Sequence, residues 1–216
     1  MNYICKCSKS DFLKHNFTYW EDRDTTSDEL EIINFLENSY KLVSKQILHI
    51  GIGNSFFAKK FFKNNHIFGI TISKKEIENA KLLNLSNYKF VLCDKYSKNF
   101  IDELNNKKFD VIVDTNLKSY SCCHESFIFF IENLFNKLNN KGMLITSKNG
   151  MRWFKELKPK LSFNFKNFFY YKLKEVDGNK ENILTINELI NLSKRYNLEF
   201  SFDDKLCYLK KWKKKL

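Results

Sequence analysis

Short hydrophobic runs alternate with amphipathic segments of helical period between residues 26 and 148. The runs predict five strands, at residues 46–50, 66–72, 88–93, 109–114 and 143–147. The amphipathic segments predict helices at residues 26–43, 54–63, 73–83, 98–105 and 124–138. Two of these helices open with a capping-box pattern, Thr26-x-x-Glu29 and Ser73-x-x-Glu76. Because strands and helices alternate along the chain, the pattern predicts a mostly parallel sheet with helices on both faces.

The alternation stops after residue 148. Residues 150–175 are rich in aromatic and basic side chains, which predicts a covering flap or hairpin. A partner surface and a basic-aromatic contact to nucleic acid are the alternatives. Beyond this segment, Thr185-x-x-Glu188 predicts a helix through Tyr196, and residues 198–202 and 206–210 predict a terminal pair of antiparallel strands.

The most informative stretch is residues 47–55, Ile-Leu-His-Ile-Gly-Ile-Gly-Asn-Ser, in which an apolar strand runs into a glycine turn before a helix. Gly51 and Gly53 have no Cβ, so a ligand can approach the backbone closely. Free N–H groups at the start of the helix would face that ligand. A dinucleotide site needs a third glycine where this chain has Phe56, so the turn suits a ligand without a pyrophosphate.

Charge and cysteine content narrow the function classes. The chain has 37 Lys+Arg against 25 Asp+Glu, a formal charge of +12, which is typical of proteins that bind polyanions. The chain is also loaded with Lys, Asn, Ile and Phe, residues with AT-rich codons, so genome composition accounts for much of this charge. No secretory signal precedes the cysteines, which are therefore expected to be reduced, in a cytoplasmic protein without a metal site. They are Cys5, Cys7, Cys93, Cys122, Cys123 and Cys207. No run reaches the roughly 20 apolar residues of a transmembrane helix.

Residues 44–148 resemble the class I S-adenosylmethionine-dependent methyltransferases, and the terminal helix and strand pair extend the resemblance to most of the chain. The resemblance implies an α/β, Rossmann-like doubly wound fold. Its mostly parallel seven-stranded sheet would carry a C-terminal antiparallel strand pair and an aromatic insertion after strand five. It also implies a single domain over residues 1–216. The expected parts are an N-terminal helical cap (1–43), a cofactor-binding core (44–148), an aromatic cover (149–180) and the terminal helix and strands (181–216).

The resemblance further implies where S-adenosylmethionine would bind. The glycine turn would hold the methionine portion, the end of the second strand the ribose, and Asp94 the adenine amino group. The tip of the fourth strand, with Asp114 and Asn116, would lie between cofactor and acceptor. The expected cofactor-binding residues are His49, Gly51, Gly53, Asn54, Ser55, Thr71, Asp94, Asp114 and Asn116. The segment 68–76 is most similar to the cyclopropane-fatty-acid-synthase-like branch of the family.

The chain departs from the family pattern at three positions. His49 stands where an acid is usual, Ser55 replaces a frequent third glycine, and Thr71 replaces the ribose-binding acid. Loss of that carboxylate would cost on the order of 1.5–3 kcal/mol, the usual worth of a hydrogen bond to a charged group. The Thr71 hydroxyl and the Glu76 carboxylate are the substitutes within reach. These departures leave open a catalytically degenerate binding protein with a methyltransferase fold.

Methyl transfer from a sulfonium is an in-line displacement, so the protein mainly positions the acceptor and takes up its proton. His124, at the start of the helix after strand four, is the expected base, and Tyr120 is the expected acceptor contact. No Asn/Asp-Pro-Pro-aromatic signature follows strand four, which tells against methylation of base amino groups in DNA. The expected acceptor is a small molecule such as a sugar, lipid or metabolite. An RNA methyltransferase is a further alternative because of the basic charge.

Overall fold

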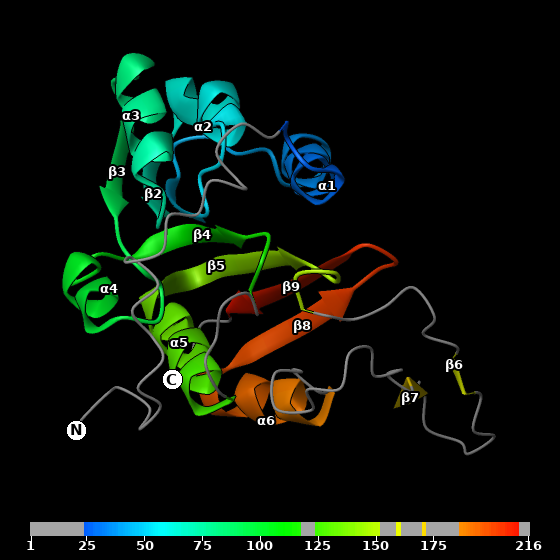
Figure 1. Cartoon of the computed structure of the whole chain (residues 1–216). Helices are drawn as coiled ribbons and strands as arrows, with labels where there is room; N and C mark the ends of the chain where they lie inside the picture. Colours follow the sequence, from blue (N-terminus) through cyan, green and yellow to red (C-terminus); the bar gives the residue numbers. More distant parts are fainter. Residues whose placement is uncertain (1–23, 118–123, 152–158, 161–169, 172–185, 212–216) are drawn as a thin grey trace.

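The computed structural model describes residues 24–117, 124–151, 159–160, 170–171 and 186–211. Its centre is a seven-stranded sheet with the strand order β3-β2-β1-β4-β5-β9-β8 (Figure 1). The first five strands of this order are parallel, β9 is antiparallel to β5, and β8 is antiparallel to β9. The strands are β1 (Gln46–Ile50), β2 (His66–Thr71), β3 (Tyr88–Leu92), β4 (Phe109–Asp114), β5 (Leu138–Ser147), β8 (Leu198–Phe202) and β9 (Leu206–Lys211). The predicted fold class is confirmed.

Helices cover both faces of the sheet (Figure 1). On one face lie α1 (Ser27–Phe35), α2 (Phe56–Phe61) and α3 (Lys74–Leu82), and on the other lie α4 (Lys98–Glu103), α5 (His124–Lys137) and α6 (Ile186–Tyr196). Each face has its own apolar core: Ile32, Phe57 and Val111 belong to the first, and Phe100, Phe127 and Ile112 to the second. Because β1 and β4 are buried on both faces, they read as nearly continuous apolar runs rather than as alternating strands.

Three element boundaries differ from the sequence prediction. The first helix continues past α1 as a π-helical turn, Leu36–Tyr40, and ends before residue 43 because Lys41 adopts φ 52°. The second helix, α2, is shorter than predicted and passes into a 3-10 turn at Phe62–Asn64. β5 begins at Leu138 instead of residue 143, since the expected turn at residues 140–142 is absorbed as a shift in register against β4.

The aromatic segment after β5 lies mostly outside the described residues. Within it, β6 (Pro159–Lys160) and β7 (Tyr170–Tyr171) form a two-stranded antiparallel ladder, in line with the predicted hairpin. The predicted covering role falls on the undescribed part and stays a prediction. In the ranges that the structure describes, no helix is long and apolar enough to cross a membrane. The same ranges contain no group of three or more His, Cys, Asp or Glu side chains placed to hold a metal.

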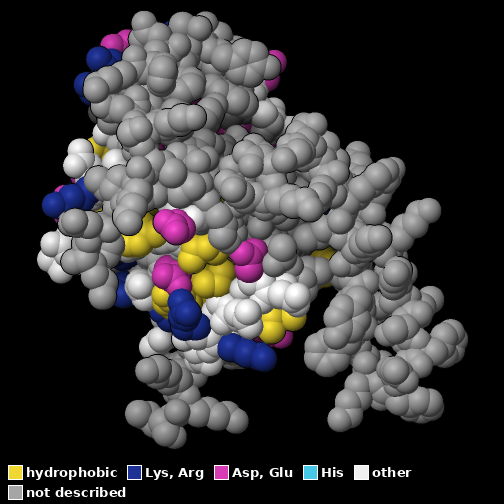
Figure 2. All heavy atoms as spheres, turned by 60° about the horizontal axis from the view of Figure 1, so that its bottom comes forward, with side chains coloured by type: hydrophobic (Ala, Val, Ile, Leu, Met, Phe, Trp, Pro, Cys, Tyr) yellow, Lys and Arg dark blue, Asp and Glu magenta, His cyan; other side chains and the backbone are white. Residues whose placement is uncertain are grey.

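Some of the lysine side chains stabilise the ends of helices. Several lysines donate to main-chain carbonyls at the ends of helices, where the helix dipole favours a cation: Lys108 to Asn136 O, Lys137 to Leu104 O and Lys211 to Phe135 O. On the face seen in Figure 2, the described basic side chains lie among acidic and apolar ones. The described part of that face therefore has mixed charge.

Candidate functional site

The topology creates a switch point at the carboxyl ends of β1 and β4. β1 is flanked by β2 on one side and by β4 on the other. The chain leaves β1 toward α2 on one face of the sheet, and it leaves β4 toward α5 on the opposite face (Figure 1). In doubly wound folds, ligands bind at such a switch point, because the two loops diverge there.

The glycine turn after β1 has the backbone that its sequence predicts. Gly51 and Gly53 adopt φ 80° and 51°, and Ser55 adopts φ 58°. The turn is closed by the Gly51 N–H, which donates to Ile70 O at 2.7 Å, and by the Ser55 N–H, which donates to Ile52 O at 2.8 Å. A Cβ added to Gly51 would meet no atom of the described residues within 4 Å. The outer side of the turn is therefore open to a ligand.

The two residues after the second glycine point in different directions. The Asn54 side chain accepts the Phe56 N–H at 3.0 Å and donates to the Thr25 hydroxyl at 3.1 Å, which links the turn to the segment before α1. The Ser55 hydroxyl is buried and shares a 3.2 Å hydrogen bond with the Tyr88 hydroxyl. The Ser55 backbone thus forms part of the turn, while its side chain is hydrogen-bonded in the core.

Glu76 joins the glycine turn to the second strand. One oxygen of its buried carboxylate accepts the Gly53 N–H at 3.1 Å and the Thr71 hydroxyl at 2.5 Å. The Ser73 hydroxyl caps α3 by accepting the Glu76 N–H at 3.2 Å, while the Ser73 N–H donates to the Thr71 hydroxyl at 3.1 Å. The sequence motif predicted that Glu76 serves as a capping partner. Its carboxylate reaches the glycine turn, at the strand end that lacks the family's usual acid and where the sequence analysis expected Glu76 to lie within reach.

Asp94 lies two residues beyond the end of β3, at the same edge of the sheet. Its carboxylate is buried and accepts the Tyr96 N–H at 2.9 Å. Its carbonyl accepts the Ser97 hydroxyl at 2.7 Å, which tightens the turn into α4. The described residues therefore hold the predicted adenine-reading acid in one defined position.

A buried ion pair occupies the tip of β4. The Lys95 ammonium lies 2.8 Å from the Asp114 carboxylate and 2.5 Å from Asn116 O, and the other Asp114 oxygen accepts the Asn116 N–H at 2.9 Å. The Lys95 ammonium also lies 5.1 Å from the centre of the Phe130 ring. Burial lowers the pKa of Lys95, and the nearby Asp114 charge opposes this shift. The predicted pair Asp114 and Asn116 is thus held in place by a lysine that the sequence analysis did not single out.

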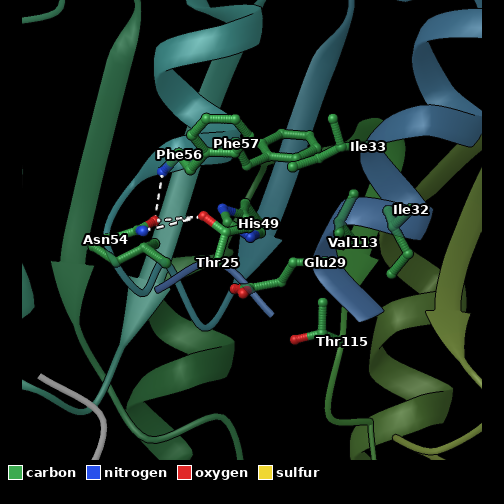
Figure 3. Close-up of a pocket in the computed structure, with 11 residues that line it drawn as sticks. Thr25, Glu29, Ile32, Ile33, His49, Asn54, Phe56, Phe57, Val113 and Thr115 are labelled. Carbon is green, nitrogen blue, oxygen red and sulfur yellow. Dashed lines mark hydrogen bonds between the residues drawn. The ribbon is translucent and has the colours of Figure 1, made fainter. Parts of the chain in front are cut away.

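His49 lies beneath the glycine turn with 2% of its surface exposed. Its ring packs on Phe57 with 4.6 Å between centroids. Among the described residues, its Nδ1 atom has no hydrogen-bond partner. Burial lowers the pKa of His49 to about 3, and the ring is therefore neutral at pH 7. Figure 3 shows His49 beside Thr25 and Glu29 in a small pocket.

The predicted catalytic pair is not tested by this geometry. Tyr120 lies outside the described residues. His124 is the first residue of α5, as predicted, but its side chain is also outside the described set. The structure does bring together the other predicted residues, since all of them lie at or just beyond the carboxyl ends of β1, β2, β3 or β4, at one edge of the sheet. To these it adds Lys95, Thr25 and Glu29.

Comparison with known proteins supports the fold assignment. The chain matches no protein-family model and no curated protein sequence. It is similar to the crystal structure of the N-methyltransferase NodS from Bradyrhizobium japonicum with S-adenosylhomocysteine, with a TM-score of 0.55 and 16% identity over 87% of this chain and 88% of that chain. A S-adenosylmethionine-dependent methyltransferase from Clostridium acetobutylicum gives a TM-score of 0.52 and 15% identity over 92% and 93% of the two chains. The [4+2]-cyclase SpnF gives a TM-score of 0.51 and 16% identity over 85% of this chain and 63% of that chain.

These likenesses define the fold as that of the class I S-adenosylmethionine-dependent methyltransferases. At such low identity they carry no information on the reaction or on the branch. The similarity of residues 68–76 to the cyclopropane-fatty-acid-synthase-like branch remains a prediction.

Proposed function

We propose that this protein binds S-adenosylmethionine at the carboxyl edge of β1, β2 and β3 and transfers its methyl group to a small-molecule acceptor. The observation that carries the proposal is the Glu76 carboxylate, which lies against the Gly53 N–H and the Thr71 hydroxyl. An anionic acceptor at this place suits the two hydroxyl groups of a ribose. The departure at Thr71 is thereby compensated by an acid five positions further along the chain.

The remaining contacts suit the other parts of the same cofactor. The open side of Gly51 would allow the methionine portion to approach the backbone. Asp94 would accept the adenine amino group. When bound, the cofactor supplies an electrophilic methyl group on a sulfonium. The described residues suit this group because each of its parts would face a side chain or turn of matching chemistry.

The work left to the protein is to position the acceptor and to manage its proton. The β4 tip lies at the switch point, and the Lys95 contacts hold Asp114 and Asn116 in a fixed conformation there. Fixed positions of Asp114 and Asn116 would favour reaction, because an acceptor bound against them loses less freedom at the transition state. His124 as the base and Tyr120 as the acceptor contact remain part of the proposal.

Calorimetric titration with S-adenosylmethionine and S-adenosylhomocysteine tests cofactor binding. We expect micromolar affinity for the wild-type protein. Gly51→Arg should abolish binding, since its side chain would fill the open face of the turn, and Asp94→Ala should weaken it. Lys141→Ala, an exposed change at the opposite edge of the sheet, serves as the control. Absence of binding at millimolar cofactor would refute the proposal.

A protein that keeps this fold without methyl transfer is the second candidate. The motif departures at His49, Ser55 and Thr71 favour it. An assay for S-adenosylhomocysteine production over a panel of amines, sugars and lipids separates the two, provided that the cofactor binds. A salt titration with RNA tests the RNA-methyltransferase alternative, since phosphate contacts make affinity fall steeply with salt.

A further inference from the structure

A groove lies at the amino ends of the parallel strands, at the edge of the sheet opposite to the proposed cofactor site. It is lined by Gln46 and Phe109, the first residues of β1 and β4, and by Asn87, which precedes β3. Its volume is about 390 Å³. Small-molecule sites in proteins usually measure roughly 300–1,000 Å³, so the groove is large enough for a whole small molecule.

Three lysines give this groove its charge. Lys89, Lys107 and Lys108 line it, and no Asp or Glu is among the described residues that do so. Within the described ranges, none of the three ammonium groups pairs with a carboxylate. The acid next in sequence, Asp110, already accepts two N–H groups at 2.9 Å with its two oxygen atoms. The groove is therefore positively charged.

Two of these ammonium groups are held in place without being neutralised. Lys107 donates to Glu103 O and lies 4.8 Å from the centre of the Phe68 ring. Lys108 donates to Asn136 O at 2.5 Å. Both carbonyls lie at helix ends, which carry only about half an elementary charge each. Because an ammonium has three N–H donors, each lysine keeps donors for a ligand.

The positive charge extends beyond the groove to two further lysines. Burial lowers the pKa of Lys137, and the charges of Lys108 and Lys107 lower it further. Burial also lowers the pKa of Lys211, with Lys108 adding to the shift. These lysines therefore lie close enough to repel one another, and an anion bound among them would relieve that repulsion.

We propose that this groove binds a phosphorylated small molecule, whose phosphate group contacts Lys89, Lys107 and Lys108. Phosphate oxygens accept strong, charge-assisted hydrogen bonds from ammonium groups. The Ser86 hydroxyl and the Asn106 amide line the same groove and can contact the rest of the molecule. β2 separates the groove from the cofactor edge by six residues, or about 17 Å, so this ligand is not the methyl acceptor.

Calorimetric titration of the full-length protein with sodium pyrophosphate, in a buffer without phosphate, tests the proposal. We expect a single saturable binding event that sodium chloride at equal ionic strength does not produce. The double variant Lys107→Gln, Lys108→Gln should weaken binding at least roughly tenfold, because charge-assisted hydrogen bonds are lost. Lys107→Arg, Lys108→Arg should keep most of the affinity, because both charges remain.

Lys89→Gln tests the site without disturbing the helix ends. The Lys89 side chain is exposed and makes no hydrogen bond or ion pair in the part of the chain that the structure describes. Its replacement should leave the fold intact and weaken pyrophosphate binding several-fold. Lys74→Gln is the matched control, since Lys74 is an exposed lysine at the start of α3, near the cofactor edge. It should leave the affinity unchanged.

Equal pyrophosphate affinity in the wild type, Lys89→Gln and the double glutamine variant would overturn the proposal. An equal loss of affinity in Lys74→Gln and Lys89→Gln would overturn it too, because the attraction would then belong to the net charge and not to the groove.

A short RNA distinguishes this pocket from a nucleic-acid surface. Binding of octauridylate that falls steeply with salt and depends on the same lysines, without binding of pyrophosphate, would overturn the proposal in favour of RNA. Pyrophosphate binding that saturating S-adenosylhomocysteine leaves unchanged would support a separate site for a phosphorylated small molecule. The pyrophosphate titration needs no bound cofactor, so its outcome is independent of the proposed methyl transfer.

Discussion

The Thr71 hydroxyl donates a 2.5 Å hydrogen bond to the same Glu76 oxygen that accepts the Gly53 N–H. One carboxylate thereby connects the end of β2, the first turn of α3 and the glycine turn after β1. Because all three groups are buried, removing any of them leaves the others with unmet hydrogen-bonding capacity. The shape of the glycine turn therefore depends on a residue that follows it by more than one complete strand.

Removing one partner of the buried Lys95–Asp114 pair should lower the free energy of unfolding strongly. Lys95→Met leaves the Asp114 carboxylate without its cation, and we expect a loss of about 3–5 kcal/mol in the free energy of unfolding. Urea denaturation measures this loss. Adding Asp114→Asn to the same variant should restore most of it, because no buried charge then remains. An unchanged urea midpoint in Lys95→Met would contradict the described pairing.

His49 should make stability depend on pH. Its pKa is about 3 in the folded protein and 6.5 in a model compound, so between these values the unfolded chain binds a proton that the folded chain does not. The free energy of unfolding should therefore fall as the pH is lowered, by about 1.4 kcal/mol per pH unit from this residue alone. Urea denaturation at pH 7 and pH 5 should show a loss about 2 kcal/mol larger in the wild type than in His49→Asn.

The exposed His66 provides the control for this comparison. His66→Asn should follow the wild-type pH dependence. Equal losses in the wild type and His49→Asn would contradict a buried neutral imidazole at this position.

Gly150 should not tolerate even one added methyl group. A Cβ at this position would lie 2.0 Å from Thr115 O, where the loops after β4 and β5 meet. Both loops are also tied by Ser147, whose hydroxyl donates to Thr115 O at 2.9 Å and accepts the Gly150 N–H at 2.8 Å. We expect Gly150→Ala to lower the free energy of unfolding by about 1–3 kcal/mol, the usual cost of overpacking.

Asn140→Ala, at an exposed position of β5, should change the free energy of unfolding by less than about 0.5 kcal/mol. If Gly150→Ala were as stable as this control in urea, the close contact between the two loops would be wrong.

The sequence was sufficient to predict the sheet because its strands are buried on both faces. β1 and β4 match the predicted ranges, since an apolar run bounded by polar residues has few other solutions. The start of β5 was less predictable. Asn140-Lys141-Gly142 has turn chemistry, but pairing of Leu138 with Phe109 extends the strand through it.

The site was harder to predict than the fold because its key contacts join distant segments. Glu76 matches a local capping pattern, and only the folded chain brings its carboxylate to Gly53. Lys95 is one of many lysines, so composition hides its role beside Asp114. The departure at His49 was visible from the motif, whereas the lack of a partner for its Nδ1 within the described ranges and its place beside Glu29 depend on how α1 packs.

The most direct test of the central claim is the affinity of Glu76→Gln for S-adenosylhomocysteine, measured by calorimetry beside the wild type. Glu78→Gln is the matched control, an exposed position on the same helix. Loss of a charged acceptor for ribose hydroxyls should cost about 1.5–3 kcal/mol, or roughly ten- to hundredfold in affinity. The account predicts this loss for Glu76→Gln alone. Equal affinity in all three proteins would contradict a cofactor site built around Glu76 and the glycine turn.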